Sequence, residues 1–178
     1  MLPPMLALAF VVALVTQSHA TDLVLEARLV TPARLKVGEP VTLTMALHNI
    51  GKRALPVVKP GDGSESNWRE PFVWYTAERQ VDGKWVTVPK AQVGRCGLFD
   101  ADWDKDTVML APGARLVLAD WVDHPEYSIA LDQPGHYRML VHYAFGTATR
   151  SGVEPKGAMK GVAPFEVVSA PVTFELVR

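Results

Sequence analysis

Apolar residues recur at every second position along much of this chain. The clearest run is 41–48, whose apolar members are Val41, Leu43, Met45 and Leu47. Successive side chains of a β-strand point to opposite faces of a sheet, so this period predicts a strand with one buried face. A second long run, 136–145, has the same period and follows a Pro-Gly turn.

Similar runs follow one another along the chain, and turn-forming residues separate them. We expect about eight or nine short strands, over 22–30, 41–48, 55–59, 72–80, 85–88, 107–110, 115–122, 136–145 and 165–177. The dipeptide Asp82-Gly83 marks a hairpin between two of them. No segment has a convincing helical period. The pattern therefore predicts an all-β fold, an antiparallel sandwich of two sheets.

The first twenty residues have the character of a secretory signal peptide. Residues 5–15 are apolar but too few to span a bilayer as a helix, and Ser18 and Ala20 are small residues at the positions that signal peptidase requires. We expect residues 1–20 to be removed and residues 21–178 to form one domain, secreted or periplasmic. A short N-terminal anchor is the alternative. No cysteine directly follows the apolar run, so a lipid-attached form is not expected.

Composition narrows the classes of partner. The 178 residues carry a formal net charge of −1, so neither nucleic acid nor a membrane surface is expected as a partner of the mature domain. The one cysteine, Cys96, cannot form an internal disulfide. We interpret it as a buried, small apolar side chain. An intermolecular disulfide, or a nucleophile activated by the charge of Arg95, is the alternative.

Four carboxylates at a spacing of two resemble the opening of a calcium-binding loop. They are Asp100, Asp102, Asp104 and Asp106. The sixth position of such a loop is Lys105 here instead of glycine, and the twelfth is Ala111 instead of glutamate. The other interpretation is a solvated acidic turn whose aspartates cap their own backbone. We keep the four as weak metal candidates, commit to no metal site and expect no cofactor.

Two tryptophans lie in polar loops, one in Asn67-Trp68-Arg69 and one between two aspartates at Trp103. An indole exposed beside polar groups is typical of binding hot spots. The candidate binding residues are therefore Asn67, Trp68, Arg69, Arg95 and Trp103. The alternative is that both tryptophans fold beneath their own loops as lids.

Three pieces of the chain carry a resemblance to a known group of domains. They are Gly38-Glu-Pro-Val-Thr-Leu-Thr44 with Asn49-Ile-Gly51, then Leu110-Ala-Pro-Gly113, then Leu131 to Tyr137. These pieces resemble secreted bacterial immunoglobulin-like or fibronectin-III-like sandwich domains, and bacterial proteinase-inhibitor domains are similar in the same places. The resemblance implies a tyrosine corner formed by Leu131, Pro134, Gly135 and Tyr137, in which the phenol holds one corner of the fold. It also implies that Trp74 is the buried tryptophan of strand C.

In such a fold several loops would gather at one pole, where binding is usually found. They are 50–71, the start of 90–106, 111–113 and 146–163. The chain has no nucleophile-elbow, zinc-protease or phosphate-loop motif, so we expect a domain that is not an enzyme. The first hypothesis is an exported domain that binds a protein partner through clustered loops or a sheet edge, with proteinase inhibition as one version. The alternatives are a carbohydrate-binding module that uses Trp68 and Trp103 to bind a glycan, and an enzyme that depends on Cys96.

Overall fold

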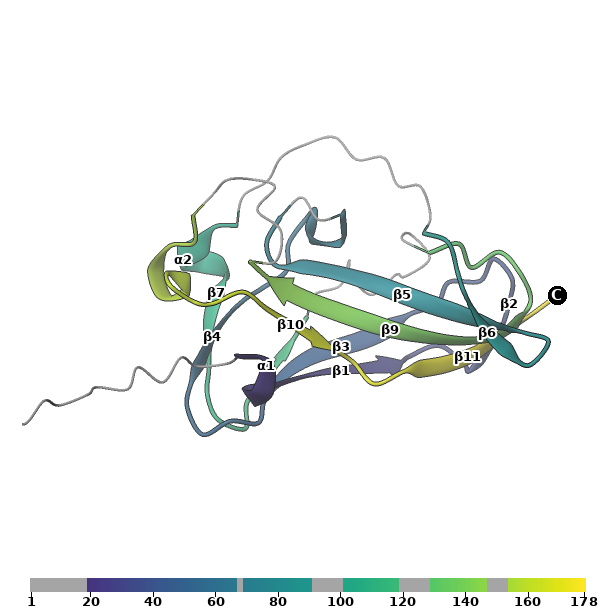
Figure 1. The fold of residues 1–178 in the computed structure, drawn as a ribbon, viewed down its shortest axis with the longest axis horizontal. Coiled ribbons are helices and arrows are strands. Elements are labelled where there is room, and N and C mark those ends of the chain that lie inside the picture. Colours follow the sequence, from purple (N-terminus) through teal and green to yellow (C-terminus); the bar gives the residue numbers. More distant parts are fainter. Residues whose placement is uncertain (1–18, 67–68, 91–100, 119–128, 147–153) are drawn as a thin grey trace, which may run out of the picture.

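The computed structural model describes residues 19–66, 69–90, 101–118, 129–146 and 154–178 (Figure 1). The strands are β1 (Leu23–Leu29), β2 (Arg34–Lys36), β3 (Leu43–Asn49), β4 (Leu55–Val58), β5 (Phe72–Val81), β6 (Lys84–Thr87), β7 (Thr107–Leu110), β8 (Arg115–Val117), β9 (Gly135–Phe145), β10 (Phe165–Val168) and β11 (Val172–Val177). The helical segments are single turns: α1 (His19–Asp22), η1 (Ser64–Ser66), α2 (Trp103–Asp106) and η3 (Gly157–Met159). The predicted all-β class is confirmed.

The described strands form three open sheets. The small sheet has the order β1-β3-β8, and the large sheet has the order β2-β11-β9-β5-β6, with β10 also paired to β9. Strands β4 and β7 form a separate two-stranded sheet. Neighbouring strands are antiparallel, except that β2 is parallel to β11. Figure 1 shows β9 and β5 running the length of the large sheet, with β1 and β3 alongside.

Alternating side chains of the small and large sheets build the hydrophobic core. Leu43, Met45 and Leu47 of β3 are buried, as their spacing predicts. Tyr75 of the large sheet is also buried, and its hydroxyl lies 3.7 Å from the sulfur of Met45. The contact joins the inward faces of the two sheets, so the core forms where the apolar halves of the alternating strands meet.

Strand β9 is the centre of the large sheet because it pairs with β5 on one side and with both β10 and β11 on the other. It begins directly after Pro134, as the Pro-Gly turn predicts. Tyr137 is 1% exposed, and its hydroxyl donates a hydrogen bond of 2.6 Å to the carbonyl oxygen of Gln133. Its ring stacks on Phe174 of β11 with 5.3 Å between the centroids. The phenol therefore ties the start of β9 to the turn before it.

The strands differ from the expected pattern in three places. The expected strand 165–177 is divided into β10 and β11, which both pair with β9. Strand β2 was not expected, because three residues are too few for a visible period; its pairing with β11 depends on a distant strand. Strand β8 covers only the first part of the expected 115–122, and residues 119–128 lie outside the described residues.

The placement of Trp74 expected from the resemblance is wrong. Its neighbours Val73, Tyr75 and Ala77 face the core and are buried, so the two-residue period directs Trp74 to the opposite face. There its ring stacks on His142 of β9, with centroids 4.7 Å apart and planes 11° apart. Because β5 has apolar residues on both faces, the sequence alone did not show which face is buried.

Candidate binding surface on the large sheet

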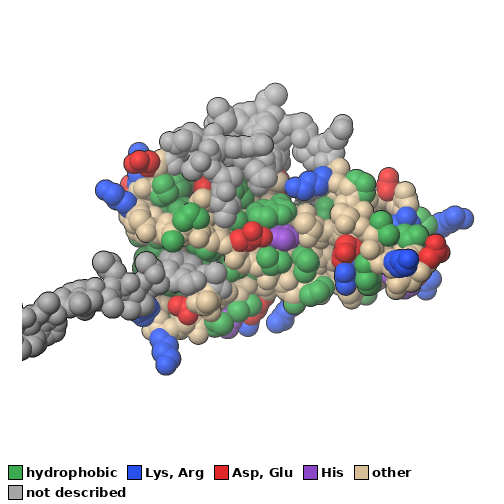
Figure 2. Space-filling model, viewed as in Figure 1, with side chains coloured by type: hydrophobic (Ala, Val, Ile, Leu, Met, Phe, Trp, Pro, Cys, Tyr) green, Lys and Arg blue, Asp and Glu red, His purple; other side chains and the backbone are tan. Residues whose placement is uncertain are grey.

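The outward-facing side chains of the large sheet form a polar and aromatic surface. They come from alternate positions of its strands and include Trp74, Thr76, Glu78, Gln80, Trp85, His136, Arg138, His142, Thr173 and Glu175. On the face of the molecule shown in Figure 2, hydrophobic, acidic and basic side chains are interspersed. No single sign of charge dominates that view, in keeping with the net charge of −1.

One end of this surface is hollowed into a groove of about 500 Å³. We call it the outer-face groove; its lining residues are Ala33, Arg34, Gln80, Trp85, His136, Tyr137, Thr173, Phe174 and Glu175. These residues lie on or beside β2, β5, β6, β9 and β11, so pairing of five strands is needed to assemble the groove. An amide, an imidazole and a hydroxyl lie in it next to an indole.

Cross-strand charge pairs hold side chains in and beside the groove. Arg34 Nε lies 3.3 Å from Glu175 Oε2. Arg138 forms an ion pair with Glu78, which is directly opposite it in the register of β5 and β9. The Arg138 guanidinium carbon also lies 4.6 Å from the centroid of the Trp85 ring. Glu78 thus fixes Arg138, and Arg138 supports one face of the indole.

A second polar group joins three strands farther along the same surface. The Nδ1 atom of His142 lies 2.8 Å from Glu166 Oε1, and its Nε2 atom lies 2.9 Å from Thr76 Oγ1. With the carboxylate accepting from Nδ1–H, the neutral ring accepts from the threonine hydroxyl. The two contacts tie β5, β9 and β10 together.

Strand β6 ends the large sheet, and among the described residues no strand pairs with its outer edge. Directly beyond β6, Lys90 forms an isolated bridge with Ile129, and the Ala130 N–H donates to the Pro89 carbonyl oxygen at 3.1 Å. All four of its residues are exposed, including Trp85 at 36% and Val86 at 50%. The N–H of Val88 donates to the carbonyl oxygen of Ala77 at 2.8 Å, toward β5. Because N–H directions alternate along a strand, the N–H of Thr87 points away from β5, to the free edge.

A smaller pocket lies on the other face of this edge. It has a volume of about 210 Å³ and is lined by Arg79, Val86, Thr87, Val88, Pro89, Ala130, Asp132, Gln133 and Tyr137. Trp85 borders the outer-face groove, and Val86 borders this pocket. The edge strand therefore has a hollow on each of its two faces.

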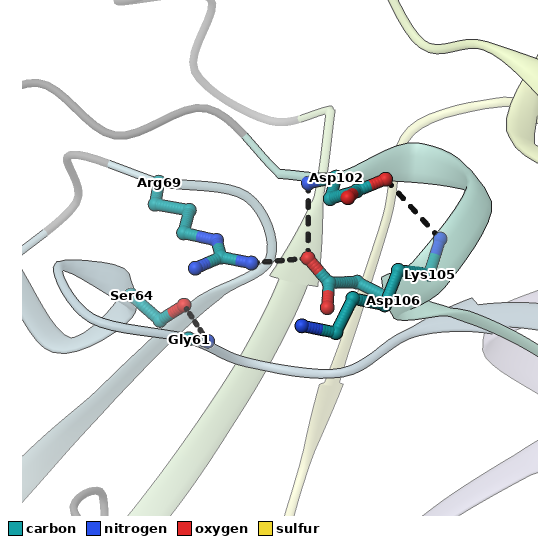
Figure 3. A network of polar contacts seen from close by, with 6 residues as sticks. All are labelled: Gly61, Ser64, Arg69, Asp102, Lys105 and Asp106. Atoms are coloured by element: carbon teal, nitrogen blue, oxygen red, sulfur yellow. Dashed lines mark hydrogen bonds and ion pairs between the residues drawn. The ribbon is translucent and has the colours of Figure 1, made fainter.

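Of the candidate binding residues from the polar loops, the structure describes Arg69 and Trp103, and Figure 3 shows the contacts of Arg69. Arg69 forms an ion pair with Asp106, whose Oδ2 atom also accepts a hydrogen bond of 2.9 Å from the N–H of Asp102. The guanidinium of Arg69 packs directly on Gly61, where an added Cβ would overlap with Nη1. The Gly61 N–H in turn donates to Ser64 Oγ at 2.9 Å. Arg69 thus joins two loop segments.

Trp103 is 6% exposed and packs edge-on against Phe145, with centroids 6.3 Å apart. This burial supports the lid interpretation, since little of the indole is left for a ligand to contact. Its loop neighbour Asp102 accepts a hydrogen bond of 3.3 Å from the N–H of Lys105 and so caps α2. Among the described residues, no group of three or more His, Cys, Asp or Glu side chains is placed to hold a metal ion. The remaining candidates, Asn67, Trp68, Arg95, Cys96 and Asp100, lie outside the described residues.

Several of the loops expected at one pole do meet there. The side chain of Asn49 donates to the carbonyl oxygens of Arg53 and Leu110 at 2.8 and 2.7 Å. The N–H of Lys59 donates to Asp106 at 2.8 Å, and Gly157 lies beside Asp104. Described parts of 50–71, 111–113 and 146–163 are therefore brought together, along with 102–106, whereas residues 91–100, at the start of the fourth expected loop, lie outside the described residues.

Burial perturbs two acids at this pole. It raises the pKa of Glu70, an effect that the hydrogen bond from the Gly146 N–H, at 2.9 Å, partly offsets. Burial also raises the pKa of Tyr143, whose hydroxyl donates to the Val58 carbonyl oxygen at 2.7 Å and accepts from the Val58 N–H at 3.1 Å. Tyr143 attaches β4, and with it the two-stranded sheet, to β9.

The groove residues were missed as a group by sequence reasoning. A usable signal was present in the hairpin: a two-residue turn at Asp82-Gly83 places Trp85 opposite Gln80, on the outward face. The partners of Trp85 on β9 and β11 depend on long-range pairing and carry no local signal.

Comparison of the chain with protein-family models, curated proteins and solved structures found no match. Among the described residues, none of the helices is long and apolar enough to span a membrane.

Proposed function

We propose that this chain is an exported, non-catalytic β-sandwich domain that binds a protein partner by accepting an extended segment of it along β6. The observation that carries the proposal is the combination at this edge: outward-directed backbone groups, exposed side chains and a hollow on each face. An added strand would satisfy the backbone groups and direct alternate side chains toward the two hollows.

An immunoglobulin-like type is part of the proposal. The split of the first strands supports it, since β1 joins the small sheet while β2 joins the large sheet parallel to β11. The bond from Tyr137 to Gln133 supports a tyrosine corner, because the hydroxyl returns to backbone a few residues upstream.

The exposed side chains of β6 favour a role in binding over a role as an edge strand that only prevents unwanted pairing. Natural edge strands avoid pairing by being short and by carrying lysine or proline. β6 is short and begins with Lys84, but Trp85 and Val86 add two large apolar side chains to the same edge. Apolar and aromatic anchors beside free backbone groups are the features that an added strand uses.

Export is tested by fractionating the source cells and sequencing the N-terminus of the mature protein. Export with cleavage gives a chain that begins at Thr21 in the exported fraction. A chain that retains residues 1–20 in the cytoplasm contradicts this part of the proposal.

The edge is tested by placing a photoreactive amino acid at position 86 and, as a control, at Val117 of β8, which lies on the edge of the small sheet. We expect cross-linking in the source cells from position 86 and not from position 117. Mass spectrometry of the cross-linked product then identifies the partner. With the purified partner, Thr87→Pro removes the edge-facing N–H and weakens binding by about tenfold or more, about 1.4 kcal/mol. Val117→Pro, the same change on the other sheet, leaves the affinity unchanged. Equal loss in both variants, or equal cross-linking from both positions, contradicts edge pairing.

A further inference from the structure

The outer-face groove is one of the two hollows beside β6, and it also carries neutral polar groups that the backbone pairing of an added strand does not use. We infer that this groove is a binding site for a neutral carbohydrate, with Trp85 as the stacking platform. Three features carry the inference: a supported indole, a lining of neutral hydrogen-bonding groups, and a charge pair that cancels within the lining.

The indole is held before any ligand arrives. Arg138 lies over one face of Trp85 at 4.6 Å, and its ion pair with Glu78 fixes the guanidinium in place. Trp85 is 36% exposed and borders the groove, where a ligand can reach the ring. A side chain oriented in advance loses less conformational freedom on binding, which favours affinity. The apolar face of a pyranose ring, made of C–H groups, is suited to packing on such a surface.

The rest of the lining matches the hydroxyl rim of a sugar. Gln80, His136 and Thr173 offer an amide, an imidazole and a hydroxyl, each able to donate and accept hydrogen bonds. They come from three different strands, so their groups reach the groove from several directions. A volume of about 500 Å³ lies within the range of small-molecule sites.

The charges in the lining are balanced. Arg34 is the arginine of the lining and Glu175 its carboxylate, and the two lie 3.3 Å apart as an ion pair. The Arg34 side chain is 71% exposed and that of Glu175 33%, so the lining carries one charge of each sign at its open side. A nucleotide or an acidic sugar would meet the Glu175 carboxylate beside Arg34, whereas a neutral oligosaccharide has no charge to balance.

The test is isothermal titration calorimetry of the mature chain, residues 21–178, with a panel of neutral oligosaccharides and their uronic-acid counterparts. The neutral panel contains gluco-, xylo-, manno-, galacto- and chito-oligosaccharides. We expect saturable binding of at least one neutral member. Trp85→Ala reduces that affinity at least tenfold, and Trp85→Phe, which keeps an aromatic face, retains part of it.

Two control variants distinguish the groove from the rest of the outward face and from the edge of β6. Trp74→Ala removes the indole that stacks on His142, outside the groove lining, and leaves sugar affinity unchanged. Thr87→Pro disrupts edge pairing but leaves sugar affinity unchanged. Failure of the sugar site can therefore be distinguished from failure of the proposed edge pairing. Arg138→Met removes the support of the indole and weakens sugar binding. The melting temperature of each variant shows whether it is folded. The inference is overturned if no neutral member of the panel binds, if only acidic sugars bind, or if Trp85→Ala binds as wild type.

Discussion

At the scale of single residues, two phenols on β9 bond to backbone outside their own strand. Tyr137 donates to the Gln133 carbonyl oxygen in the turn that precedes β9, while Tyr143 exchanges two hydrogen bonds with Val58 of β4. Both side chains are buried. A buried hydroxyl contributes mainly because its loss leaves the partner group without a hydrogen bond.

We predict that Tyr137→Phe lowers the free energy of unfolding by about 1 kcal/mol, because one carbonyl oxygen loses its donor. Tyr143→Phe removes two bonds in a fully buried site and should cost more, about 2 kcal/mol. Urea unfolding monitored by tryptophan fluorescence measures both. An unchanged midpoint for Tyr137→Phe would contradict a structural role for its hydroxyl and weaken the proposed tyrosine corner.

At the scale of elements, Asn49 joins the turns that follow β3 and β7. It is 0% exposed; its amide donates to Arg53 and Leu110, and its Oδ1 atom accepts from the Gly51 N–H at 2.9 Å. The backbone of Asn49 also accepts from the Gly113 N–H at 2.8 Å. One residue thus aligns β3 of the small sheet with the end of the two-stranded sheet.

Asn49→Ala should therefore lower the free energy of unfolding by about 2 kcal/mol, because one buried and two part-buried backbone groups lose their partners. Its neighbour Ile50 provides a matched control, since it is 55% exposed and Ile50→Ala should change stability by less than about 0.5 kcal/mol. Chemical denaturation of the two variants side by side checks this. Equal changes in the free energy of unfolding would show that the side-chain hydrogen bonds of Asn49 add little to stability.

At the scale of the whole molecule, the charges nearly balance. Most of the ion pairs on the large sheet are partly exposed, so each pair contributes little to stability. Glu70, in contrast, makes the stability of the fold depend on pH. Burial raises its pKa above the ordinary value of 4.5, so the folded chain keeps that proton at a pH where the unfolded chain has released it. Folding stability consequently falls as pH rises from 4.5 through the raised pKa.

We predict that Glu70→Gln is more stable than wild type at pH 7, because glutamine keeps an acceptor for the Gly146 N–H without a charge to bury. The difference should shrink as pH falls and vanish below 4.5, where the carboxyl is protonated in both states. Denaturation midpoints at pH 7, 5.5 and 3.5 measure it. A difference that does not vary with pH would contradict burial of an ionised Glu70 as its cause.

Much of the fold could be predicted because local patterns specify it. The alternation in 41–48 and 136–145 identified buried side chains, and Asp82-Gly83 identified a hairpin. Prediction of the candidate site was less complete. Arg69 and Trp103 were identified by residue type, but their environments make them an ion-pair partner and a buried lid. Residue type shows what a side chain can do, whereas its neighbours determine whether it is accessible.

By itself, the sequence determined the positions of most strands, several of the turns between them and which face of β3 and β9 is apolar, since these follow from a period of two and from turn chemistry. Only the tertiary structure decided which strands pair, which way Trp74 points and that Glu78, Arg138 and Trp85 meet beside a groove. The reason is that alternation orients a side chain relative to its own strand, while pairing depends on backbone edges far apart in the chain. A site assembled from five strands exists only once those edges have met.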